Sequence, residues 1–221
     1  SFLAVYPDRQ DELLFGKPVA AYFDSPAFVQ PRVAKTVLAD HGKVRQYGAV
    51  IVDDEKAALI AARRRAPNLA RTAHGLGEVY RTTVFGKLLA LAVIKFSTLD
   101  PLGMGIEMEA GKPGWCDALN GLPGLFGSSL SETYELRRLL DFLLAALAAK
   151  GTGAVERPVG QADLLGDVGA RLTAYHAALD ADRDLRYWDA VAGAREAYRE
   201  RTRLGFDGRT ETIDFALLTP Q

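Results

Sequence analysis

Hydrophobic positions recur at three- and four-residue spacing over much of the second half of the chain, a pattern that predicts amphipathic helices. Between residues 82 and 96 apolar side chains cover most of the circumference, so we expect that helix to be buried. Shorter or weaker helical patterns occur at 56–65, 161–181 and 185–204. The strongest pattern is that of the helix expected at 131–150, where six leucines mark one face: Leu136, Leu139, Leu140, Leu143, Leu144 and Leu147.

The first fifty residues contain several prolines and glycines, which favour loops over long helices. Two short apolar stretches, 35–38 and 44–52, flank Gly42 and Lys43 and are typical of strands joined by a turn. We therefore expect a loop-rich segment with a β-hairpin at 1–53. A helical region at 54–221 should follow and carry a glycine-rich loop at 103–128, so the fold class is mainly α. Several helices are too apolar to face water alone, which favours a piece of a larger protein or one of several associated pieces.

The composition is that of an ordinary globular protein, with 48% hydrophobic and 25% charged residues. The 27 basic and 28 acidic residues give a net charge of -1, which does not favour a nucleic-acid partner. One cysteine and three widely separated histidines lack the spacing of metal ligands, so neither a metal nor a bound cofactor is expected. No apolar stretch reaches the ~20 residues that span a bilayer, and no signal peptide is visible, which favours a cytoplasmic location.

The candidate chemistry lies in the glycine-rich loop, where seven glycines stand between Leu102 and Ser128. An aromatic face can cover the apolar face of a pyranose, while carboxylates and amides bind its hydroxyls. A carboxyl group packed against a tryptophan would also have its ionised form disfavoured, so it could act as an acid near neutral pH. A structured connector whose acids only cap helices and bind turns is the alternative. The residues concerned are Glu107, Glu109, Lys112, Trp115, Asp117 and Asn120.

Two nucleotide-binding motifs are excluded at this loop. The glycine spacing resembles GxGxxG only loosely, and no βαβ unit precedes it, so a dinucleotide site is not expected. Lys112 is not part of a P-loop, because no Gly-Lys-Ser/Thr follows at the required spacing.

The segment Gly114-Trp-Cys-Asp-Ala-Leu-Asn120 resembles the Asp-Trp-Asn-Asp-Gly-Met-Asn segment of the cellobiose phosphorylase family, glycoside hydrolase family 94. The wider stretch 104–136 is similar to large bacterial cellobiose phosphorylase-like proteins. The resemblance implies that Asp117 is the general acid and that Trp115 and Asn120 contact sugar. It also implies part of an (α/α)6 barrel, although about five helices are predicted where a complete barrel has about twelve. Gly114 replaces an acid that in the family helps to hold the donor-site sugar.

The resemblance implies an inverting phosphorolysis of β-glucosidic bonds in an oligosaccharide, with inorganic phosphate as co-substrate. Asp117 would donate a proton to the glycosidic oxygen while phosphate attacks the opposite face of the anomeric carbon. If water attacks instead, the enzyme is an inverting hydrolase and needs a base, for which Glu109 and Glu107 are the local candidates. A non-catalytic carbohydrate-binding or structural module is the third hypothesis. The partner is expected to be the remainder of a larger barrel enzyme or a second copy of the chain.

A second group of polar residues precedes the helix at 82–96. Arg71, Tyr80 and Arg81, together with His74, could reach a shared pocket and bind substrate. A surface loop explains the same residues equally well.

Overall fold

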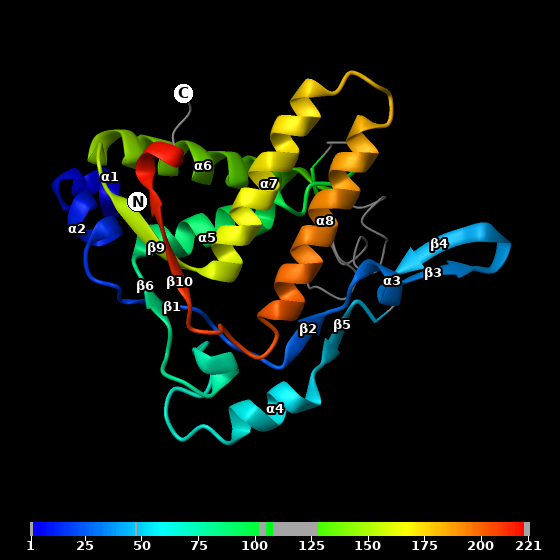
Figure 1. The fold of residues 1–221 in the computed structure, drawn as a ribbon, viewed down its shortest axis with the longest axis horizontal. Helices are drawn as coiled ribbons and strands as arrows, with labels where there is room; N and C mark the ends of the chain where they lie inside the picture. The colour runs from blue at the N-terminus through cyan, green and yellow to red at the C-terminus, as the bar shows by residue number, and fades with distance from the viewer. Residues whose placement is uncertain (1, 47, 102–104, 108–127, 219–221) are drawn as a thin grey trace.

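The computed structural model describes residues 2–46, 48–101, 105–107 and 128–218, and this part of the chain is mainly α-helical (Figure 1). That confirms the predicted mainly-α class. Three short helices precede the five longer ones: α1 (Phe2–Val5), α2 (Gln10–Phe15), α3 (Arg32–Lys35), α4 (Asp54–Ala61), α5 (Val84–Phe96), α6 (Leu130–Lys150), α7 (Val159–Ala177) and α8 (Arg183–Arg201). Short 3-10 turns occur at η1 (Pro7–Arg9), η2 (Asp40–Gly42), η3 (Ala73–Gly75) and η5 (Phe215–Leu217).

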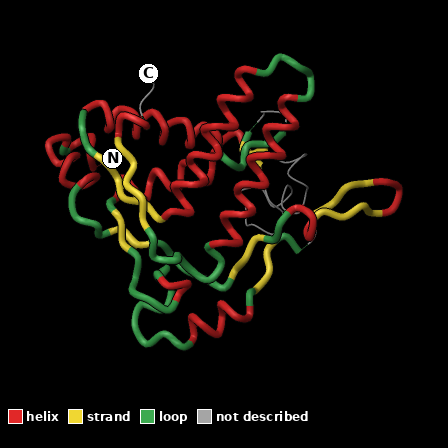
Figure 2. Tube along the Cα trace, in the orientation of Figure 1, coloured by secondary structure: helices red, strands yellow, loops and turns green. Residues whose placement is uncertain are grey.

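The strands of the described residues form five separate antiparallel pairs (Figure 2). The pairs are β1 (Ala20–Ala21) with β6 (Arg81–Thr82), β2 (Ala27–Val29) with β5 (Val50–Val52), β3 (Thr36–Ala39) with β4 (Lys43–Gln46), β7 (Ile106–Glu107) with β8 (Ser128–Ser129), and β9 (Ala154–Pro158) with β10 (Thr210–Asp214). The predicted hairpin is confirmed as β3–β4, which projects from the helical body (Figure 1). The stretch 44–52 is not one strand, because β5 leaves the hairpin and pairs with β2.

The starts of two helices are set by side-chain caps. The Thr83 hydroxyl accepts a hydrogen bond from the Gly86 amide at 3.1 Å and starts α5. The N-cap of α6 is Ser129, whose hydroxyl accepts from the Glu132 amide at 3.3 Å, so this helix begins one residue before the predicted Ser131. The predicted helix at 56–65 ends at Ala61 instead, and the Arg63 side chain binds Asp24 and the carbonyl oxygens of the loop that follows.

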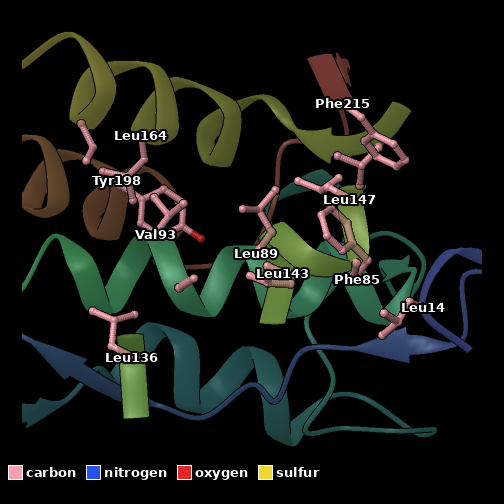
Figure 3. Packing of buried hydrophobic residues seen from close by; sticks show 14 of the residues in the cluster. Leu14, Phe85, Leu89, Val93, Leu136, Leu143, Leu147, Leu164, Tyr198 and Phe215 are labelled. Atoms are coloured by element: carbon pink, nitrogen blue, oxygen red, sulfur yellow. The ribbon is translucent and has the colours of Figure 1, made fainter. Parts of the chain in front are cut away.

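The main core is built around α5, which the apolar sequence at 82–96 predicted to be buried. Phe85 is fully buried there, and Leu143 and Leu147 of α6 are each 3% exposed. Figure 3 shows these side chains gathered with Leu164 of α7, Tyr198 of α8 and Phe215. Helices α7 and α8 lie side by side as a helical hairpin (Figure 1). Within the described ranges, no helix combines the length and apolar character needed to cross a membrane.

Candidate functional site

The two residues that flank the glycine-rich segment 108–127 are held next to each other. Glu107 in β7 pairs with Ser128 in β8. The Glu107 amide donates to the carbonyl oxygen of Thr98 at 2.6 Å, and the Ile106 amide donates to Oγ1 of Thr133 at 2.9 Å. Because Thr98 follows α5 and Thr133 lies in the first turn of α6, the base of the segment is fixed between these two helices.

Asp100 adds a further anchor at the same place. Its amide donates to the Gly105 carbonyl oxygen at 2.8 Å, and its Oδ2 accepts a hydrogen bond of 2.5 Å from the Ser128 hydroxyl. Asp100 is buried, at 7% exposure. Its carboxylate therefore joins the chain before the segment to the chain after it, away from competing water.

Glu107, one of the predicted catalytic carboxylates, is paired with α8. Its side chain is 4% exposed, and its Oε2 lies 4.0 Å from Nη2 of Arg195, whose side chain is 1% exposed. Trp188 donates from its indole Nε1 to the same oxygen at 3.4 Å, and Arg195 also donates to the carbonyl oxygen of Ser97. The carboxylate thus joins the base of the glycine-rich segment to α8 through a buried ion pair.

Arg32 of α3 extends this network toward the N-terminal segment. Its guanidinium lies over the Trp188 ring, 5.0 Å from the ring centroid, and binds Oδ1 of Asp189 at 2.8 Å and Oε1 of Glu196 at 2.9 Å. Burial alone would lower the pKa of Arg32, but the two carboxylates outweigh it and raise the pKa. The network ties α3, α8 and the base of the segment together.

Tyr80, a predicted substrate contact, belongs to a different group of side chains. It is buried at 7% exposure and packs against Phe206, with ring centroids 4.9 Å apart, and against Tyr22, at 6.1 Å. Burial raises the pKa of Tyr80 to about 12, and the neighbouring Tyr22 adds to the shift. These contacts are those of a small second core.

The two predicted arginines nearby bind backbone oxygens. Arg71 donates to the carbonyl oxygens of Gly77, at 3.0 Å, and Arg65, at 2.7 Å. Arg81 donates to the carbonyl oxygen of Val19 at 3.0 Å and is exposed. Within the part of the chain that the structure describes, their side-chain hydrogen bonds do not connect them with Glu107. The structure gives both arginines a role in holding loops, and their contact with substrate stays a prediction.

The remaining predicted site residues lie outside the described residues. They are Glu109, Lys112, Trp115, Asp117 and Asn120, and their catalytic and sugar-binding roles stay predictions.

Trp188 and Arg195, which contact Glu107, were not among the predicted site residues. The signal that could have found them is their spacing: seven residues are about two turns of a helix, so both side chains project from one face of α8. A tryptophan and an arginine on the same face of a predominantly polar helix indicate that this face contacts another part of the protein.

In comparisons with known proteins, neither a protein-family model nor a curated protein matches the chain. Among the described residues, no three His, Cys, Asp or Glu side chains come together as metal ligands.

Proposed function

We propose that the chain is a carbohydrate-active enzyme, or part of one, that cleaves β-glucosidic bonds with phosphate and inverts the anomeric carbon. The observation that carries the proposal is the resemblance of segment 114–120 to the cellobiose phosphorylase segment, in which Trp115, Asp117 and Asn120 are the matching residues. An acid beside a tryptophan and an amide is a chemically sensible set for protonating a leaving sugar.

The anchoring of the segment supports the proposal. Catalytic groups must be held within about 0.5 Å of a productive geometry, which a loop achieves only if its ends are fixed by the scaffold. Here the β7–β8 pair, the Asp100–Ser128 hydrogen bond and the buried Glu107–Arg195 pair hold Glu107 and Ser128, the residues that flank 108–127.

In the proposed reaction, Asp117 begins in its protonated form. It gives its proton to the glycosidic oxygen as the bond from that oxygen to the anomeric carbon breaks. An oxygen of inorganic phosphate forms a bond to the same carbon from the opposite face, so the products are a sugar 1-phosphate of inverted configuration and a shortened sugar. Phosphate is already a nucleophile, so this reaction needs no second carboxylate to activate water.

Glu107 has a positioning role in this scheme. Its carboxylate is paired with Arg195 and bonded by Trp188, so it is engaged at the base of the segment. If water were the nucleophile, the required base would be Glu109, the other local carboxylate. The experiment below distinguishes this hydrolase from the phosphorylase.

We also propose that the helical region is part of an (α/α)6 barrel. The antiparallel packing of α7 on α8 and the packing of α5 on α6 are in keeping with the paired helices of such a barrel. The described residues form five longer helices, α4 to α8, whereas a complete barrel has about twelve. The remainder would come from a larger polypeptide or from a second copy of the chain.

The proposal is tested by incubating the chain with cello-oligosaccharides in the presence and absence of inorganic phosphate. The expected result is phosphate-dependent release of α-glucose 1-phosphate, detected by ³¹P NMR. Turnover without phosphate, yielding an inverted free sugar, would replace the phosphorylase with the hydrolase. Binding of the oligosaccharide without any turnover would leave a carbohydrate-binding module and contradict both enzymatic assignments.

A further inference from the structure

A recess of about 220 Å³ lies between the end of α7 and the beginning of α8. Its lining consists of Arg171, Arg183, Arg186, Tyr175 and Tyr187, with three alanines between them. No carboxylate belongs to the lining that the described residues form. Three guanidinium groups around one hollow favour an anion.

The three arginines differ in how many of their N–H groups are already paired with nearby carboxylates. Arg186 is engaged on both terminal nitrogens by Asp180, each at 2.7 Å. The only carboxylate that the described residues place near Arg171 is that of Asp167, which lies 4.0 Å from Nη2 of Arg171. The buried Nε of Arg171 has no hydrogen-bond partner among these residues. Arg171 therefore has N–H donors available for a ligand.

Arg183 is partly engaged by neighbouring protein groups. Its Nε lies 3.6 Å from the Asp184 carboxylate, and its Nη1 donates to the carbonyl oxygen of Ala178 at 3.1 Å. Its guanidinium also lies over the Tyr175 ring, 4.8 Å from the centroid. A guanidinium held against an aromatic ring loses less conformational freedom when it binds a ligand.

The two tyrosines, whose ring planes are inclined at 54°, supply aromatic surface and a further donor. Their ring centroids are 5.3 Å apart, and the Tyr187 hydroxyl is buried without a hydrogen-bond partner among the described residues. Burial raises the pKa of Tyr187, and Tyr175 adds to the shift, so the hydroxyl keeps its proton at neutral pH. A buried hydroxyl without a partner costs free energy unless a ligand satisfies it.

We propose that this recess binds a phosphate monoester carried on a single ring. Arg171, Arg183 and Tyr187 offer three donor groups for the three outer oxygens of a phosphate, whereas a carboxylate has only two oxygens. The ring of the ligand would pack against Tyr175 and Tyr187. The volume lies below the ~300 Å³ at which drug-sized pockets begin, which limits the ligand to about one ring.

The recess adjoins a second hollow of about 180 Å³ that shares both tyrosines and reaches Asp100. Asp100 is the residue that holds Ser128 at the base of the glycine-rich segment. The site itself uses only residues of α7 and α8 and the turn between them.

Isothermal titration calorimetry of the full chain with phenyl phosphate tests the proposal. Arg171→Gln and Arg183→Gln should each weaken binding about tenfold or more, because each removes a charge-assisted contact. The matched control is Arg138→Gln, which removes an exposed arginine paired with Glu135 on α6 and should leave the affinity within about twofold. Binding should also weaken as salt is raised.

Three results would overturn the site. Phenyl phosphate fails to bind the folded wild-type chain, both arginine variants bind it as tightly as the Arg138→Gln control, or benzoate binds as tightly as phenyl phosphate. Circular dichroism of each variant shows whether it is folded. The Asp117→Asn variant should bind phenyl phosphate normally, which separates this site from the glycine-rich segment.

Discussion

Replacing Glu107 with glutamine removes a buried charge while keeping an acceptor for the Trp188 indole. The carboxylate oxygen and the Arg195 nitrogen are 4.0 Å apart, and both side chains are almost fully buried. At an effective dielectric constant of about 20, opposite charges at this distance attract by about 4 kcal/mol. Removing the carboxylate also recovers part of its own desolvation cost, so we expect Glu107→Gln to lower the free energy of unfolding by about 3 kcal/mol.

The measurement is urea unfolding followed by circular dichroism at 222 nm and pH 7. The control is Glu135→Gln, the same change in an exposed pair with Arg138 whose side chains are 69% and 75% exposed, which should cost less than about 1 kcal/mol. A Glu107→Gln variant as stable as the control would refute the buried pair as the anchor of the segment. A loss near 3 kcal/mol would support it.

Three further predictions concern stability. Burial alone would raise the pKa of Asp53, but the hydrogen bonds from Arg203 and the Lys56 amide outweigh it and lower the pKa. The contribution of Asp53 to stability is therefore present above its unfolded pKa of about 3.9 and is lost as pH falls through the lower folded value. Asp53→Asn should accordingly reduce the acid-induced shift of the urea midpoint. The pKa of Tyr80 is raised to about 12 by burial, with Tyr22 adding to the shift. Tyr80 therefore contributes stability below pH ~10 that is lost as pH rises toward 12, and Tyr80→Phe should flatten this loss and remove one late step from the tyrosinate absorbance titration. Phe85 is fully buried in the main core, so Phe85→Ala should cost about 3–5 kcal/mol in thermal or urea unfolding, and a cost below 1 kcal/mol would contradict the core.

Local sequence signals predicted two of the helices closely. The leucine repeat of α6 and the apolar stretch of α5 gave both elements within two residues, because each helix has a continuous face to bury. The β9–β10 pair was not predicted, although it is the longest strand pairing among the described residues. Its strands lie more than fifty residues apart, and β10 is mostly polar and exposed, so neither local periodicity nor a turn signal marks the pairing.

The candidate site was predicted only in part. Local chemistry nominated Glu107, but its partners Trp188 and Arg195 are about eighty to ninety residues away, and only the folded chain brings them together. Tyr80 was nominated for its chemistry, and the structure places it in an aromatic cluster with Phe206. A residue type shows what a side chain can do, whereas burial and partners decide what it does in the fold.

The proposed function depends above all on Asp117 as the general acid. Its most direct test is the rate of α-glucose 1-phosphate release from cello-oligosaccharides by the Asp117→Asn variant, compared with Asp141→Asn, which changes an exposed aspartate of α6. We expect a loss of about 10²- to 10⁴-fold for Asp117→Asn and a near-normal rate for Asp141→Asn, with both variants folded. A folded Asp117→Asn variant that releases the product at the wild-type rate would contradict the claim.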